Sequence, residues 1–201
     1  MSRPLDRVRA HLDAHFEQAE PDVASVTFLG ADPVDVLRYR SGASGNDMVV
    51  HYVSLGCSRH PMVDPAAVLV DPERGPRAEV VLRLRNPGPV TGLARSVAVV
   101  AASPTVEGVV LAPDALVDLG TPLWDRPSGR APFTALLLGD SDIADLPLDP
   151  PRDPVRFLSA TPITATEAAW VRLKGAEAMR DAWRSDGVDV IDPNRPAAQP
   201  S

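Results

Sequence analysis

The sequence predicts an α+β fold: a mixed, mostly antiparallel central sheet with an N-terminal helix, a middle helix and a C-terminal amphipathic helix packed on it. Two observations lead to this prediction. Strand-like apolar runs dominate the first half of the chain, and helical periodicity marks both of its ends. Strands and helices are therefore segregated along the chain, whereas a βαβ repeat would alternate them.

The first half of the chain supplies one helix and several strands. Residues 4–19 place apolar side chains at helical spacing and precede Pro21, and residues 23–29 and 34–40 are strand-like. Residues 48–55, MVVHYVSL, are nearly all apolar, β-branched or aromatic, which is typical of a central strand covered on both faces. Residues 78–85 alternate, which predicts a strand with one face in water.

The middle of the chain is less regular. Residues 93–102 have apolar side chains at helical spacing, although their valines make a strand the alternative prediction. Residues 109–111 and 115–119 are short strand candidates, and residues 133–138 form another apolar strand candidate. An acidic, proline-containing loop is expected to follow over residues 139–154.

The C-terminal region combines a strand with a helix. Residues 155–160 are strand-like, and Pro162 is expected to end that strand. Thr164 and Glu167 have the spacing of a capping box, in which each side chain satisfies a free backbone N–H of the first turn. One helix is then expected to run to Gly187, with Trp170 facing the sheet on the same side as Ala169, Leu173, Ala176 and Trp183.

Composition excludes several classes of protein. The net charge of −7 and the scattered arginines argue against nucleic acid as a partner. Cys57 is the only cysteine, so no intramolecular disulfide can form. The N-terminus lacks the apolar segment of a signal peptide, and no apolar run approaches the roughly 18 residues that a membrane helix needs. We therefore expect a cytoplasmic protein that has no membrane partner.

The candidates for chemistry are weak. Cys57 and His60 have a Cys-x-x-His spacing, which could form a nucleophilic pair or half of a metal site. His11 and His15 are four residues apart on a predicted helix, and the acidic loop lacks the spacing of a calcium site. No Walker A, GxSxG or HExxH motif is present. We expect no catalytic residue, no metal and no cofactor.

Several segments in a fixed order carry a family resemblance. Residues 56–62, GCSRHPM, resemble a Gly-Met-Ser-x-x-Pro-Met stretch after a strand, and Leu93-Ala94-Arg95 resembles a Leu-Ala-Arg at the start of a helix. The remaining segments are Pro132-Phe133, residues 155–162 with Thr166-Glu167, Gly175-Ala176-Glu177 and Asp192-Pro193-Asn194-Arg195. The chain resembles the suppressor-of-fused domain in its short bacterial form, as a single domain over residues 5–196 with a disordered tail at 197–201.

The resemblance implies a non-catalytic α+β domain that binds another protein. Animal members sequester transcription factors, whereas bacterial members look like immunity proteins that neutralise a toxin. Animal members use a tyrosine after Leu-Ala-Arg, where this chain has Ser96, and an acidic residue after the helix, near which Glu107 lies. The resemblance therefore implies Glu107 as a protein-binding residue.

A second binding candidate comes from the residues themselves. Trp124 lies in an expected loop beside Asp125 and Arg126, and Trp and Arg are enriched at interface hot spots. Trp124 could equally close the edge of the core.

Three functions stay open at this point. The first is an immunity-type protein that binds a partner such as a basic toxin, which an acidic chain would attract. The second is a thiol-dependent hydrolase that uses Cys57 and His60, and the third is a structural assembly protein. The sequence leaves the oligomeric state open.

Overall fold

The computed structural model describes residues 4–43, 45–63, 66 and 71–198. A seven-stranded sheet forms its centre, in the order β1-β2-β3-β4-β9-β8-β5. Neighbouring strands are antiparallel except β4 and β9, which are parallel. The predicted α+β class and the mixed, mostly antiparallel sheet are therefore confirmed.

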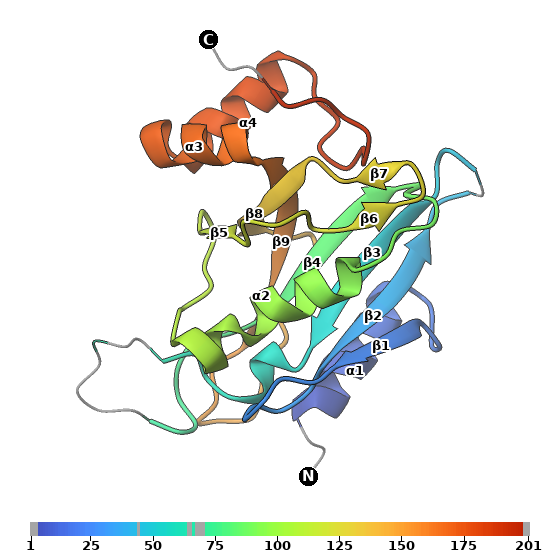
Figure 1. Cartoon of the computed structure of the whole chain (residues 1–201). Helices are drawn as coiled ribbons and strands as arrows, with labels where there is room; N and C mark the ends of the chain where they lie inside the picture. Colours follow the sequence, from blue (N-terminus) through green and yellow to red (C-terminus); the bar gives the residue numbers. More distant parts are fainter. Residues whose placement is uncertain (1–3, 44, 64–65, 67–70, 199–201) are drawn as a thin grey trace.

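The elements follow one another along the chain as in Figure 1. They are α1 Pro4–His15, β1 Asp22–Val26, β2 Val34–Ser41, β3 Val49–Leu55, the 3-10 turn η1 Cys57–Arg59, β4 Arg77–Arg85, α2 Leu93–Glu107, β5 Leu116–Asp118, β6 Asp125–Arg126, β7 Gly129–Arg130, β8 Phe133–Asp140, β9 Val155–Thr164, α3 Ala165–Lys174 and α4 Ala176–Ser185.

Helices cover both faces of the sheet. Helix α2 packs on one face through an apolar cluster that includes Val97, Val80 and Leu136. On the opposite face α1 packs against β2, β3, β4 and β9, and α3 with α4 packs against β8 and β9. Figure 1 shows α2 crossing the front of the sheet, α1 behind it, and the α3–α4 pair at one end.

The first part of strand β4 is buried on both faces, so the prediction of one wet face is wrong there, whereas Arg83 and Arg85 at its end are half-buried on the predicted wet face. Glu79 and Val81 occupy the face that the alternation assigned to water. Val81 packs in the α1 cluster. The Glu79 carboxylate accepts hydrogen bonds from the backbone N–H of Gly56 at 2.9 Å and of Ser58 at 3.0 Å, and from the hydroxyls of Ser54 and Ser58. A polar side chain on β4 thus anchors η1 from inside the core.

Pro162 does not end its strand. It lies inside β9, opposite Leu136 of β8. Pairing with β4 ends at Ser159, so β9 is free of a strand partner on that side near Pro162. The Pro162 carbonyl accepts a hydrogen bond from Arg195 at 2.8 Å. The missing N–H therefore points to the side from which β4 has diverged, where proline is tolerated.

The C-terminal helix is two helices, which corrects the prediction of one. The Thr164–Glu167 capping box is present as predicted. Gly175, at φ 91 and ψ 166, then breaks the run between α3 and α4. The break at Gly175 changes which positions of the helical repeat face the sheet, so α3 and α4 do not continue one apolar face. The buried positions are Glu167, Ala168, Val171, Ala176, Met179 and Trp183.

The predicted inward face was consequently wrong in α3. Leu173 is 74% exposed and Ala169 is exposed, while Trp170 is half-buried at the margin of the α3–α4 cluster. Trp183 is buried, as expected for that side of the helix.

Other boundaries differ in smaller ways. Helix α2 extends beyond residue 102 to Glu107, which excludes the strand alternative there, and ends at Gly108 with φ 69. Residues 109–111 form no strand. In the segment expected to be a tail, Ala198 is buried and its N–H donates to Glu167 at 3.1 Å; residues 199–201 lie outside the described chain. In the described part of the chain, no helix has the length and apolarity to cross a membrane.

Candidate protein-binding surface

Glu107 lies at the end of α2 beside a run of exposed valines. It is the last residue of the helix, and its side chain is exposed. Val106, Val109 and Val110 are 59%, 37% and 37% exposed. Large hydrophobic residues are few on the described surface, and three of them fall within this short segment. Clustered exposed apolar side chains mark interaction sites more often than scattered ones do.

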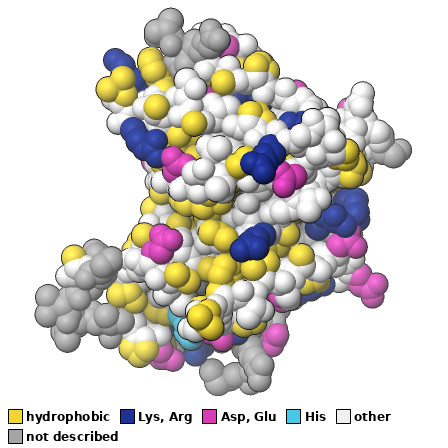
Figure 2. All heavy atoms as spheres, in the orientation of Figure 1, with side chains coloured by type: hydrophobic (Ala, Val, Ile, Leu, Met, Phe, Trp, Pro, Cys, Tyr) yellow, Lys and Arg dark blue, Asp and Glu magenta, His cyan; other side chains and the backbone are white. Residues whose placement is uncertain are grey.

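The chain leads from this segment into an edge strand of the sheet. Strand β5 follows it in the chain and is paired with β8 on one side. Its other side has no strand partner among the residues described. Figure 2 shows hydrophobic side chains gathered in the hollow between α2 and the part that carries α3 and α4. We call residues 106–110 together with β5 the α2–β5 surface.

Trp124 belongs to the core, so of the two roles that the sequence left open, the exposed anchor does not fit its position. Its side chain is 1% exposed and packs against Phe133, with ring centroids 5.3 Å apart. Hydrogen bonds hold the backbone around Trp124 in place: Leu123 N–H donates to Phe133 O, and Ala131 N–H donates to Trp124 O. This loop closes over the α2 side of the sheet, so the alternative of closing the core edge is the one observed.

Asp125 and Arg126 are separated from Glu107. They form β6, which pairs with β7 in a short hairpin. Asp125 exchanges backbone hydrogen bonds with Thr91, just before α2, while Arg126 contacts Asn194. The 15 residues of α2 put Glu107 roughly 20 Å from this end, at about 1.5 Å per residue. The four predicted binding residues therefore do not form one patch.

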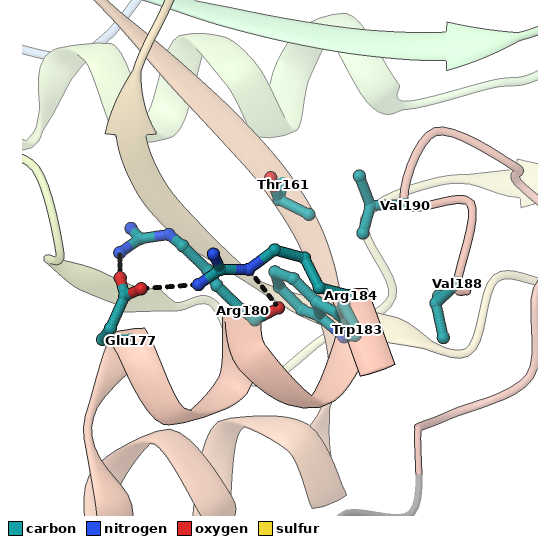
Figure 3. Close-up of a pocket in the computed structure, with 7 residues that line it drawn as sticks. All are labelled: Thr161, Glu177, Arg180, Trp183, Arg184, Val188 and Val190. Carbon is teal, nitrogen blue, oxygen red and sulfur yellow. Dashed lines mark hydrogen bonds and ion pairs between the residues drawn. The ribbon is translucent and has the colours of Figure 1, made fainter. Parts of the chain in front are cut away.

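A crevice lies between α4, β9 and the segment after α4, and Figure 3 shows its lining. It measures about 490 Å³. Its charged groups already have partners: Arg180 pairs with Asp114 at 2.5 Å, and Arg184 pairs with Glu177 at 2.6 Å and with Asp181 at 2.5 Å. The lining residues are Thr161, Glu177, Arg180, Trp183, Arg184, Val188 and Val190.

Cys57 and His60 lack the features of a nucleophilic pair. Cys57 is buried, and that burial, with the nearby Glu79 charge, raises the pKa of its thiol well above the usual value. The His60 side chain is 65% exposed and lies 3.5 Å from Asp32. A reactive cysteine needs an accessible thiol with a lowered pKa. Among the described residues, no three His, Cys, Asp or Glu side chains form a group that could hold a metal.

The exposed valines are the residues that the sequence interpretation missed. The segment 109–111 was a short strand candidate, and valines in a sheet strand would be packed against neighbouring strands. A useful signal was Gly108, because a glycine after a helical run ends the helix and turns the chain outward.

Comparison with known families and structures now adds to this geometry. The family model for suppressor of fused protein (SUFU) matches residues 30–196. The chain belongs to the suppressor of fused family. Proteins of this family are in general non-catalytic binding proteins. No curated protein sequence is significantly similar to the chain.

Solved structures share the suppressor of fused fold. A chain of the Sufu-Fu complex has a TM-score of 0.69 at 18% identity, over 96% of this chain and 91% of that one. A putative homologue from Neisseria gonorrhoeae has a TM-score of 0.66 at 19% identity, over 96% of each chain. Drosophila Suppressor of Fused has a TM-score of 0.68 at 17% identity, and this chain spans 51% of its length. These likenesses show the fold.

Proposed function

We propose that this protein is a non-catalytic binding domain that neutralises a toxin by binding it, as an immunity protein does. The binding region is the α2–β5 surface. Membership of the suppressor of fused family supports protein binding, and the structure of the Sufu-Fu complex is an instance of it in a relative.

One observation carries the choice of surface: Val106, Val109 and Val110 are exposed beside Glu107, in the segment that leads along the chain to the edge strand β5. An exposed strand edge can accept a strand from a partner, and apolar side chains beside it would be buried in the same contact. A carboxylate at the rim would favour a basic partner.

Charge supports the same kind of partner. The chain has a net charge of −7, which accelerates encounter with a basic protein at low ionic strength. The thiol-hydrolase alternative receives no such support, because Cys57 is buried and its thiol pKa is raised.

A capture and rescue experiment tests this proposal. The tagged protein is used at low salt to capture partners from its source cell, and each captured protein is then expressed alone in a test host. We expect a partner that arrests growth alone and is tolerated when this chain is co-expressed. A captured partner that is harmless by itself would leave protein binding intact and refute the immunity role.

A further inference from the structure

The crevice beside α4, which we call the α4 crevice, arises where two parallel strands diverge. Pairing of β9 with β4 ends at Ser159, and the segment after α4 bonds to both strands beyond that point. Arg85 N–H of β4 donates to Ile191 O at 2.8 Å. Arg195 donates to Pro162 O of β9, also at 2.8 Å. The crevice of about 490 Å³ therefore has fixed walls, and its volume is within the range of roughly 300–1,000 Å³ that is typical of ligand sites.

The inner wall of the α4 crevice is apolar. Val188 and Val190 are half-buried in it, and Figure 3 shows them arranged around the side chain of Trp183. The indole of Trp183 is held in place, because its Nε1–H donates to Glu167 at 3.1 Å and the guanidinium of Arg195 lies 5.6 Å from its ring centre. The polar atom of Trp183 is thus already used, and the wall offers apolar surface to an occupant.

The rim of the crevice holds two arginines whose charges are balanced. Arg184 donates to Glu177 at 2.6 Å and to Asp181 at 2.5 Å, and Arg180 pairs with Asp114 at 2.5 Å. Hydrogen bonds of this kind occupy the edges of a guanidinium and leave its flat face available to an aromatic ring. Among the described residues, no aromatic ring lies over either of these two arginines.

We infer that the α4 crevice receives an aromatic side chain of the partner protein, between the apolar wall and Arg184. An aromatic ring gains more here than an aliphatic group, because it adds a cation–π contact with the guanidinium. An acidic group gains little, since carboxylates already balance the arginines. Aromatic anchors in apolar pockets that polar groups surround are typical interface hot spots.

The crevice borders the surface proposed above. Asp114, which pairs with Arg180 at the rim, lies in the chain between Val110 and β5. A partner that covers the α2–β5 surface could therefore extend into the crevice. The partner as the source of the ring rests on the proposed function, whereas the aromatic site itself does not.

Titration with phenol, followed by ¹³C NMR of the valine methyl groups, tests the site without any partner. We expect saturable shifts of the Val188 and Val190 signals and none of the Val23 signals on the distant strand β1. Cyclohexanol, a ring of matched size, should bind about fivefold more weakly, the factor that a cation–π contact contributes at an exposed site. Unmoved Val188 and Val190 signals would refute the site, and equal affinities would refute the aromatic assignment.

Arg184→Gln tests the stacking contact. It should remove the preference for phenol over cyclohexanol. Arg172→Gln is the matched control, since Arg172 is also an exposed helical arginine in an ion pair, with Asp118, and it does not line the crevice. It should keep the preference. A preference that survives in Arg184→Gln, or is lost equally in both variants, would refute the contact with Arg184.

Partner capture tests the source of the ring. Val190→Asp, once its urea midpoint shows that it folds, should abolish phenol binding and weaken capture at least tenfold, and Arg184→Gln should weaken capture about fivefold. Capture that is lost in Val106→Asp but unchanged in Val190→Asp and Arg184→Gln would refute the crevice as part of the interface and leave the proposed surface intact. Capture that is lost only in Val190→Asp and Arg184→Gln would support the crevice and refute the α2–β5 surface.

Discussion

At the scale of single residues, the three tryptophans have different environments that determine their energetic roles. Trp124, in the loop before β6, is 1% exposed, Trp183 is 6% exposed, and Trp170 is half-buried. This burial differs from the expectation that Trp170 faces the sheet, because Trp124, an open candidate for the binding surface, is the most buried of the three.

Truncation of these side chains should follow their burial. We expect Trp124→Ala to lower the free energy of unfolding by about 3–5 kcal/mol, the usual range for a large aromatic in a core. Trp170→Ala should cost roughly half as much, because less apolar area is buried. Urea midpoints at equal m-values measure both. A larger loss for Trp170→Ala would contradict the packing described for α3.

Cys57 should react slowly in the folded protein. Its thiol is buried and its pKa is raised, first by burial and then by the charge of Glu79. We expect iodoacetamide at neutral pH to label it rapidly after denaturation and at least tenfold more slowly in the native state, because the thiolate is the reacting species. Fast native labelling would restore the thiol-hydrolase hypothesis.

His51 should make stability depend on pH. Burial, followed by the charge of Arg83, lowers the pKa of His51 to about 4 from 6.5. Between these values the unfolded chain binds a proton that the folded chain does not, so stability falls as the pH drops from about 6.5 towards 4. His51→Asn should flatten this part of the profile of urea midpoints. An unchanged slope would assign the effect to other groups.

At the scale of elements, the Glu167–Arg195 pair joins α3 to the end of the chain. Glu167 caps α3, accepts a hydrogen bond from Trp183 Nε1 at 3.1 Å, and pairs with Arg195 at 2.7 Å. Burial raises the pKa of Glu167, but Arg195 and backbone N–H groups outweigh it, so the pKa is lowered. The pair therefore stabilises the fold above about pH 4.5 and less as the pH falls below that value.

Removing that charge should be costly. We expect Glu167→Gln to destabilise the protein by about 3–5 kcal/mol, because it leaves Arg195 buried without a counter-charge. Glu177→Gln is the control, since its ion pairs are exposed and should be worth less than about 1 kcal/mol. Urea denaturation at pH 7 compares them. Equal losses would mean that Glu167 acts through its cap alone.

Local sequence signals predicted most of these elements. The run 48–55 predicted the central strand β3, and the spacing of Thr164 and Glu167 predicted the capping box. Both structures are determined by residues that are close together in the sequence. The break at Gly175 was missed because glycine is tolerated inside a helical pattern. The burial of Trp124 and Glu79 depends on which distant segments pack over them, and no local pattern contains that information.

The candidate site was predicted in part. The family resemblance implied Glu107 as a protein-binding residue, and its side chain is exposed. The exposure of the neighbouring valines was not predicted, because a valine-rich run has the same composition in a buried strand and in a loop with exposed apolar side chains. Whether Glu107, Asp125 and Arg126 contact a partner stays a prediction.

At the scale of the whole molecule, the proposed binding region starts at one end of α2. The exposed valines of the α2–β5 surface begin at the C-terminal end of this helix. The acidic chain would add long-range attraction for a basic partner that falls as salt is added.

Partner capture with a matched pair of surface variants tests the central claim most directly. Val106→Asp places a charge on the α2–β5 surface, and Val23→Asp places the same charge on the distant edge strand β1, where Val23 is 52% exposed. Once both variants are shown to fold, we predict that Val106→Asp weakens capture of the partner at least tenfold and that Val23→Asp captures as much as the unmodified chain. Equal capture by both variants would show that the partner binds elsewhere and would contradict the account.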